Sequence, residues 1–202
     1  MVARSKIIAT GSYLPEKIMG NDQLSQLVDT SDAWIKKRTG IAQRHIAADG
    51  QSNADLAIAA ATRAMQASNV MAQDIDLIVM ATTTPDNTFP ANACAVQRGL
   101  GVTNGAAFDV QAVCSGFIFA LNVVNNMIAM GQARCALVVG SEIYSRILDW
   151  SDRTTCVLFG DGAGAVILQA SDGDSGIIDT MVGSDGTHYN ALYVDGGPAS
   201  TG

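Results

Sequence analysis

The apolar positions of the chain follow two patterns: short continuous runs, and longer stretches in which they recur every three or four residues. Continuous runs are typical of buried strands, whereas the longer period is typical of helices with one buried face. The short runs predict strands over residues 6–10, 76–82, 106–110, 135–140, 155–159, 163–168 and 176–182. The periodic stretches predict helices that begin near Asn21, Thr30, Ser52, Pro90 and Cys114.

The order of these elements predicts an α/β fold. Buried parallel strands need helices that cross over their faces, and strands and helices alternate here as far as residue 170. Residues 171–176 read Ser-Asp-Gly-Asp-Ser-Gly, which is the composition of a linker. We therefore expect one layered α/β domain over residues 1–170 and the incomplete start of a second unit over residues 171–202.

Composition and charge narrow the choice of function. The 202 residues include 12 Lys and Arg against 19 Asp and Glu, a net charge of −7, and 48% are hydrophobic. We expect no nucleic-acid partner, because an acidic chain has few cations to replace phosphate counterions. The most apolar stretch, residues 117–130, is broken by three asparagines, so no membrane span is expected. Four cysteines without a CxxC pair indicate reduced thiols in a cytoplasmic protein.

Cys114 is the strongest candidate for chemistry. A predicted strand leads through residues 111–113 into a predicted apolar helix that begins at this cysteine. The positive end of a helix dipole favours the thiolate, which is the nucleophilic form of the side chain. Ser115 and Gly116 leave room for a substrate. A buried structural cysteine is the alternative, and the other three cysteines, which lie within predicted elements, are expected to be of that kind.

A basic cluster of Trp34, Lys36, Lys37, Arg38 and Arg153 stands out against the acidic background. Trp34 and Arg38 are four residues apart, so they share one face of a helix. A Trp ring beside guanidinium groups can stack on an adenine while the cations pair with phosphates. The alternative is a solvated helix end with the Trp ring packed inward.

The glycine-rich stretch and the two histidines are weaker candidates for a functional site. Residues 159–165 read Phe-Gly-Asp-Gly-Ala-Gly-Ala, but they lack the lysine and the spacing of phosphate-binding loops. We interpret this stretch as a tight turn that enters a close-packed strand. His45 and His188 are the only histidines, and no metal-ligand spacing is present, so no metal site is expected.

Four segments together resemble the β-ketoacyl-acyl-carrier-protein synthase III family of the thiolase-like superfamily. They match the family in order and separation, and they are residues 11–15, 32–41, 112–116 and 159–165. The resemblance spans the whole chain. It implies a thiolase-like layered αβα fold, with the N-terminal half over residues 1–170 and the start of the duplicated C-terminal half after it.

The resemblance implies a condensing acyltransferase that initiates fatty-acid synthesis. Cys114 would take an acyl group, typically acetyl, from acyl-coenzyme A as a thioester. Malonyl-acyl carrier protein would then decarboxylate, and its carbanion would attack that thioester to give a 3-oxoacyl product. A thiolate is both a good nucleophile and a good leaving group, which suits this exchange. Acyl-coenzyme A is a substrate in this scheme, and no cofactor is expected.

The resemblance also implies binding roles for the basic cluster. Trp34 and Arg153 would sandwich the adenine of coenzyme A. Arg38 and Thr30 would contact its nucleotide or its phosphates.

Two phenylalanines would shape the acyl pocket according to the same resemblance. Phe159 would line it, and Phe89 would reach across the two-fold interface of a homodimer to close the partner's pocket. The family also uses a His and an Asn from its C-terminal half to stabilise the carbanion and the oxyanion. The sequence ends before both, and neither His45 nor His188 matches, so we expect this chain to be part of a larger enzyme.

Three alternatives remain open from the sequence. The first is a relative with another starter unit, of polyketide or quinolone type, in which Tyr144 narrows the pocket. The second is a non-catalytic fragment that binds coenzyme A and dimerises. The third, an unrelated cysteine hydrolase or nucleotide-binding domain, would need a His near Cys114 or a phosphate-binding helix after Gly164, and the sequence shows neither.

Overall fold

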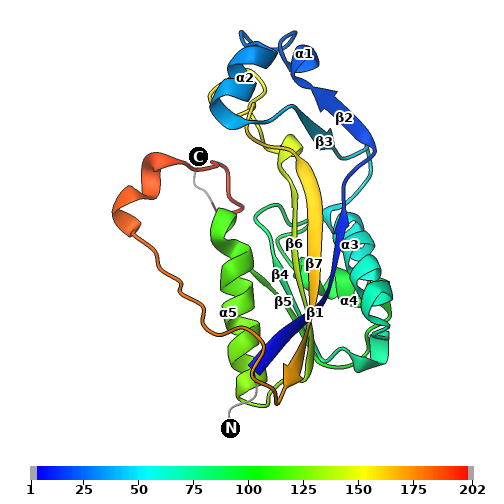
Figure 1. Cartoon of the computed structure of the whole chain (residues 1–202). Helices are drawn as coiled ribbons and strands as arrows, with labels where there is room; N and C mark the ends of the chain where they lie inside the picture. Colours follow the sequence, from blue (N-terminus) through cyan, green and yellow to red (C-terminus); the bar gives the residue numbers. More distant parts are fainter. Residues whose placement is uncertain (1–3, 200–202) are drawn as a thin grey trace.

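The computed structural model describes residues 4–199, which form a five-stranded mixed sheet with helices on both faces (Figure 1). The strand order is β1-β7-β6-β4-β5. β4 pairs in parallel with β5 and β6, whereas β7 is antiparallel to both β6 and β1. The strands of this sheet are β1 (Arg4–Tyr13), β4 (Leu77–Ala81), β5 (Ala106–Val110), β6 (Cys135–Ile143) and β7 (Asp161–Ser171). The predicted α/β fold is confirmed.

Helices cover the two faces of the sheet unequally. α3 (Asn53–Ser68) and α4 (Asn92–Leu100) lie on one face, and α5 (Gly116–Ala129) lies on the other (Figure 1). α3 begins where the sequence predicts a helix near Ser52, and the Ser52 hydroxyl caps it by accepting a hydrogen bond from the Asp55 amide at 3.0 Å. The Asp55 carboxylate accepts one from the Ser52 amide in return, at 2.8 Å.

The apolar run of β4 contributes to two separate cores. Ile78 and Met80 pack with α3 and α4, whereas Leu77 and Val79 pack with α5. Successive side chains of a strand point to opposite faces, so a strand between two helical layers is apolar at every position. All four side chains are at most 1% exposed. This explains why the sequence signal for β4 is a continuous run.

A smaller lobe sits at one end of the sheet (Figure 1). It contains an antiparallel pair of strands that the sequence did not predict. Its elements are β2 (Lys17–Gly20), α1 (Asn21–Leu24), α2 (Asp32–Thr39) and β3 (Gln43–Ile46). The buried residues Cys156 and Val157, from the segment between β6 and β7, complete the apolar cluster of this lobe. That segment is therefore fixed to the lobe by packing.

Residues 155–159 do not form the predicted strand, because the segment is folded into turns. The Asp152 carboxylate accepts hydrogen bonds from the Thr154 amide at 2.9 Å and from the hydroxyls of Thr154 and Thr155 at 2.6 and 2.8 Å. An aspartate that bonds the backbone two residues ahead competes with extended structure. Of the two strands predicted over residues 155–159 and 163–168, only the second is present, as part of β7.

The predicted strand over residues 176–182 is also absent. The Ile177 amide donates to the Ser5 carbonyl at 2.8 Å, and the Asn122 side chain donates to Thr180 at 2.6 Å. A single backbone hydrogen bond to the start of β1 is not enough to form a strand pairing, so the segment has no regular secondary structure. It continues as the orange and red trace of Figure 1 beside α5. Residues 200–202, the last of the expected second unit, lie outside the described residues, as do residues 1–3.

Several helical segments are shorter than the sequence predicts. The helix expected from Asn21 ends at Leu24, and the helix expected from Pro90 begins at Asn92. Short segments of 3-10 helix complete the secondary structure among the described residues: the single turns η1 (Ala72–Asp74), η2 (Val113–Ser115) and η3 (Tyr144–Arg146), and the longer η4 (Gly186–Ala191), which is kinked at His188.

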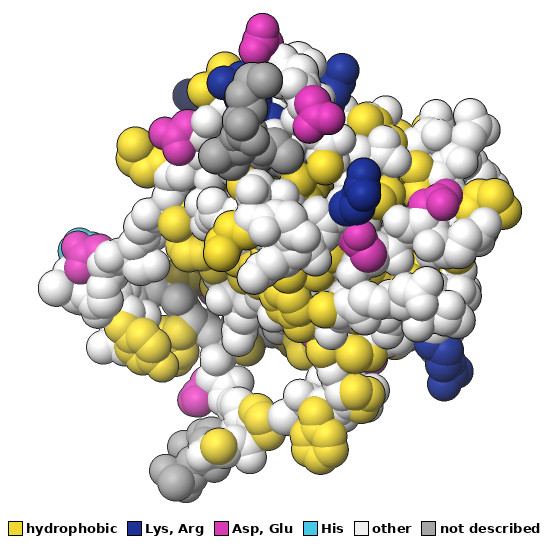
Figure 2. Space-filling view, turned by 90° about the horizontal axis from the view of Figure 1, so that it is seen from below, with side chains coloured by type: hydrophobic (Ala, Val, Ile, Leu, Met, Phe, Trp, Pro, Cys, Tyr) yellow, Lys and Arg dark blue, Asp and Glu magenta, His cyan; other side chains and the backbone are white. Residues whose placement is uncertain are grey.

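Part of the surface is strongly apolar. Figure 2 shows hydrophobic side chains gathered across the middle of the lower face, with few charged ones among them. In the C-terminal segment, Ile178, Met181 and Tyr189 are 85%, 90% and 79% exposed. Large apolar patches of this kind are typical of surfaces that other parts of a protein cover. Among residues 4–199, no helix has the length and apolarity needed to cross a membrane.

Candidate active site

Cys114 lies at the junction between β5 and α5, in the single turn η2. Its side chain is exposed, and it forms no disulfide. The helix begins at Gly116 rather than at Cys114, so the thiol precedes the first turn of α5. The predicted strand-turn-helix arrangement is present, with this correction to where the helix starts.

The turn that presents Cys114 is strained. Val113 has φ +47°, a left-handed conformation that β-branched residues rarely adopt. The turn closes with a hydrogen bond from the Ser115 amide to the Ala112 carbonyl at 3.1 Å. Immediately after it, Gly116 packs so closely on β4 that an added Cβ would lie 3.2 Å from the Cβ of Ala81. The thiol is therefore held at the end of β4 by close backbone packing.

Glu142 organises the backbone that follows β4. Its carboxylate accepts hydrogen bonds from the Thr83 amide at 2.8 Å, the Thr83 hydroxyl at 3.0 Å and the Thr82 hydroxyl at 3.3 Å. The hydroxyl of Thr84 donates to it as well. Four donors from three successive residues fix this segment against the end of β6.

Tyr144 links the residues that bond Glu142 to a second aromatic ring, that of Phe159. Its hydroxyl lies 3.1 Å from the hydroxyl of Thr83, and its ring stacks on Phe159 with centroids 4.8 Å apart. Burial raises the pKa of Tyr144; the hydrogen bond with Thr83 opposes this, and the charges of Glu142 and Cys114 add to it. Tyr144 follows the end of β6 and Cys114 follows the end of β5, and both strands run parallel to β4, so the aromatic pair and the thiol lie at the same end of the sheet.

The basic cluster assembles around Trp34. The guanidinium groups of Arg38 and Arg153 lie 4.8 Å and 5.4 Å from the centroid of its ring, within cation–π range. Arg153 also donates to the Asp29 carbonyl at 2.8 Å and lies 3.5 Å from the Asp29 carboxylate. Both arginines are exposed, and the Trp ring is only half-buried. Trp34 also packs against the apolar cluster of the small lobe, so the ring is partly packed inward and partly open to the two guanidinium groups.

Thr30 and Phe89 occupy contrasting environments. The hydroxyl oxygen of Thr30 is buried without a hydrogen-bond partner among the described residues, which is uncommon for a polar atom. Phe89 is 84% exposed in the loop between β4 and α4. The structure does not bring Phe89 against any other predicted site residue of the same chain.

The two histidines lie in unrelated places. His45 belongs to β3, and its Nδ1 atom lies 2.5 Å from the Pro15 carbonyl oxygen. His188 belongs to η4 and is exposed, with Nε2 3.8 Å from the Asp185 carboxylate. Within residues 4–199, no group of three or more His, Cys, Asp or Glu side chains is placed to hold a metal ion.

Sequence reasoning missed the buried polar residues that fix this region. They are Arg44, Asn53, Asp161 and Glu142, and the first three are at most 5% exposed. Glu142 comes soon after the apolar run of residues 135–140, and Asp161 lies between two glycines. A charged residue in such surroundings is a weak sequence indication of a buried polar role. Arg44 lies among other polar residues and gave no such indication.

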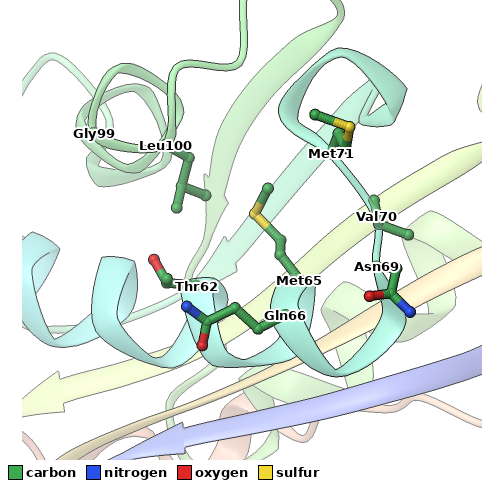
Figure 3. A pocket seen from close by; sticks show the side chains of 8 residues that line it. All are labelled: Thr62, Met65, Gln66, Asn69, Val70, Met71, Gly99 and Leu100. Carbon is green, nitrogen blue, oxygen red and sulfur yellow. The ribbon is translucent and has the colours of Figure 1, made fainter.

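One surface depression lies away from Cys114. It has a volume of about 540 Å³ and is lined by the C-terminal parts of α3 and α4 and the residues after them (Figure 3). None of its lining residues is titratable; they are Thr62, Met65, Gln66, Asn69, Val70, Met71, Gly99 and Leu100. α3 and α4 end near the points where β4 and β5 begin, whereas Cys114 follows the end of β5. The depression and the thiol therefore lie at opposite ends of these strands.

The sequence and the fold both match known proteins. The profile of the family described as 3-oxoacyl-[acyl-carrier-protein] synthase III matches residues 108–186, which include Cys114. A β-ketoacyl-[acyl-carrier-protein] synthase III from Rhodospirillum centenum is 59% identical over 205 residues, covering 100% of this chain and 64% of its own length. The chain thus spans about two thirds of the length of such relatives.

Two solved structures extend the match to the fold. The 3-oxoacyl-(acyl carrier protein) synthase III of Pseudomonas aeruginosa is 40% identical with a TM-score of 0.91, over 97% of this chain and 62% of its own. A priming β-ketosynthase from the R1128 polyketide biosynthetic pathway is 34% identical with a TM-score of 0.86, over 93% and 57% of the two chains. Since sequence, fold and the segment around the thiol all agree, the chain belongs to the β-ketoacyl-[acyl-carrier-protein] synthase III family.

Proposed function

We propose that this chain carries the nucleophile of a condensing acyltransferase that initiates fatty-acid synthesis. The observation that carries the proposal is an exposed thiol on a strained turn, between β5 and the first turn of α5, in a chain of this family. A nucleophile presented ahead of a helix N-terminus meets unpaired amide groups and the positive end of the dipole. Such a position suits the formation of a thioester.

The reaction proceeds in two transfers. The Cys114 thiolate attacks the thioester carbonyl of acyl-coenzyme A, the coenzyme A thiolate leaves, and the acyl group stays on Cys114. Malonyl-acyl carrier protein then loses carbon dioxide, and its carbanion attacks the new thioester and expels the Cys114 thiolate. Donors for the carbanion and the oxyanion, a His and an Asn in the family pattern, belong to the C-terminal half.

The basic cluster is our proposed site for the nucleotide of coenzyme A. Trp34 offers a half-buried ring with guanidinium groups within cation–π range, and adenine would replace Arg153 as the direct neighbour of that ring. Arg153 is exposed and held by Asp29, so it can close over the other face of the base. Arg38 supplies charge for a phosphate, and the unpartnered hydroxyl of Thr30 supplies a polar contact.

The acyl pocket is proposed to favour a short chain such as acetyl. Phe159 lines it, and the stacked ring of Tyr144 occupies space beside it. Because the Tyr144 hydroxyl is tethered to Thr83, the ring cannot easily move aside for a longer chain. A relative that uses another starter acyl group is the second candidate, since the R1128 priming β-ketosynthase has a similar fold.

We propose that the protein is a cytoplasmic homodimer. Within residues 4–199, β5 is an edge strand of the main sheet, and an exposed edge is a template for a second strand. Phe89 projects from the loop between β4 and α4, so it is free to contact a partner's pocket. Four free cysteines fit a reducing compartment. In this proposal residues 1–170 are the N-terminal thiolase-like half, and residues 171–202 begin the C-terminal half.

A proline on the outer side of β5 tests the dimer. The Ala106 amide donates toward β4, to the Asp76 carbonyl at 3.3 Å, so the Ala107 amide points away from the sheet. Ala107→Pro removes an outward donor and keeps the pairing with β4, and we expect the mass measured by light scattering to fall from dimer to monomer. A variant that remains dimeric would place the interface elsewhere.

Incubation with acetyl-coenzyme A tests the proposed function directly. We expect peptide mass spectrometry to find one acetyl group, on the peptide that contains Cys114, because the other cysteines are buried or half-buried. Acetylation of Cys94 or Cys135 instead would contradict the assignment of the nucleophile. Binding of coenzyme A without any acetylation would favour the non-catalytic alternative.

A further inference from the structure

Arg44 is a cation buried without an anionic partner. It lies in β3, is 5% exposed, and forms no ion pair within residues 4–199. Its Nη1 donates to the Met19 carbonyl at 3.2 Å, and its Nη2 donates to Asn21 Oδ1 at 2.9 Å and to the Val157 carbonyl at 3.3 Å. Its Nε has no hydrogen-bond partner in the part of the chain that the structure describes. Burial lowers the pKa of this guanidinium, and burying an unpaired charge is costly, which indicates a role beyond packing.

Asn21 continues the connection from Arg44 to α2. Asn21 is 2% exposed, and its Nδ2 donates to Asp32 Oδ1 at 3.0 Å and to the Ile41 carbonyl at 2.8 Å. Asp32 is the first residue of α2, and Ile41 follows the residue that caps its end. One amide therefore holds both ends of the helix that carries Trp34.

The Val157 carbonyl connects Arg44 to the segment that carries Arg153. Val157 belongs to the segment between Arg153 and Phe159, and it packs in the apolar cluster of the lobe. The same segment is pressed against β3 farther along, because an added Cβ at Gly160 would lie 2.8 Å from the Cβ of Arg44. Arg44 thus contacts the segment that carries Arg153 at two points, Val157 and Gly160.

We propose that Arg44 and Asn21 form a buried strut that sets the distance between Trp34 and Arg153. The strut bonds α2 on one side and the segment that carries Arg153 on the other, so it fixes the gap in which an adenine would stack. A planar guanidinium with donors at fixed angles suits this task better than an ammonium. The assignment makes both residues positioning residues, and it rests on the proposed function.

The test compares two acetyl donors for Cys114. Acetyl-coenzyme A uses the nucleotide site, whereas the acetyl thioester of N-acetylcysteamine lacks the nucleotide and reaches only the thiol. For Arg44→Lys and for Asn21→Ser, we expect the KM for acetyl-coenzyme A to rise about tenfold, from lost binding energy. The rate of acetylation by the truncated donor should stay within about twofold, because the turn at Cys114 is not part of the strut.

Arg63→Lys is the matched control. Arg63 is an exposed arginine that donates to the Ser12 carbonyl at 2.6 Å, remote from the proposed nucleotide site, and its substitution should change neither donor. If Arg44→Lys and Asn21→Ser impair acetylation by both donors equally, the two residues have a general folding role and the strut is overturned. If neither donor is affected, the strut is overturned as well. A wild-type protein that uses the truncated donor as efficiently as acetyl-coenzyme A would overturn the proposed nucleotide site and the strut together.

Discussion

Replacement of Cys114 by serine is expected to lower the rate of acetyl transfer from acetyl-coenzyme A by roughly a thousandfold or more. A serine hydroxyl is a weak nucleophile unless a base removes its proton, and neither histidine is placed beside residue 114 in the described chain. The substitution removes only the sulfur, so the strained turn and the polar bonds of Glu142 should remain. The measurement is the rate of acetyl incorporation, followed by intact-protein mass spectrometry.

Cys94→Ser is the matched control for this experiment. Cys94 is half-buried in α4, where its sulfur donates to the Ala107 carbonyl at 3.6 Å, and a serine hydroxyl can make the same bond. Acetyl transfer should then stay near the wild-type rate. Coenzyme A itself should bind Cys114→Ser as tightly as wild type, because Trp34 and Arg153 are untouched. Acetylation that persists in Cys114→Ser would move the nucleophile to another residue.

The fold was predictable where burial alone decides the structure. β4 lies between two helical layers, so its apolar run had only one interpretation once its length excluded a helix. The strands of the small lobe were not predictable in the same way, because β2 and β3 have only four residues each and pair only with each other. The false strand over residues 155–159 shows the converse error. Cys156 and Val157 are buried in turns that Asp152 stabilises, whereas Leu158 is 46% exposed, and hydrophobicity does not distinguish an apolar turn from a strand.

The candidate site was predictable to the extent that it depends on local sequence. Cys114 could be singled out as a candidate nucleophile from the strand, turn and helix around it, and Trp34 with Arg38 as a candidate ligand site from their helical spacing, but in both cases the local pattern left a purely structural role open. The proximity of Arg153 to Trp34 is different, since 119 residues separate them (153 − 34) and no local pattern joins them. The hydrogen bond from Arg44 to the Val157 carbonyl, which connects β3 with the segment that carries Arg153, is long-range as well. Long-range polar contacts of this kind depend on tertiary structure, which a single sequence does not display.

Asp161→Ala is expected to lower the free energy of unfolding by about 3–5 kcal/mol. The Asp161 carboxylate is 4% exposed and accepts hydrogen bonds from the Ala47 amide at 2.7 Å, the Ser145 amide at 2.9 Å and the Ser145 hydroxyl at 2.6 Å. Alanine would leave two backbone donors buried without an acceptor, which is costly because water cannot reach them. Urea-induced unfolding would measure the loss as a lower transition midpoint.

Two further variants separate the hydrogen bonds of Asp161 from its charge. Asp161→Asn keeps one acceptor oxygen, so its loss of stability should fall between those of wild type and Asp161→Ala. In Asp149→Ala an exposed carboxylate that accepts a hydrogen bond from the Ser151 amide at 2.8 Å is removed, and water replaces it, so the loss of stability should be much smaller than that of Asp161→Ala. Equal stability of Asp161→Ala and Asp149→Ala would mean that the buried bonds contribute nothing. Because Ser145 adjoins Tyr144, a real loss at Asp161 should also loosen the aromatic stack near Cys114 and broaden the range of acyl chains that the thiol accepts.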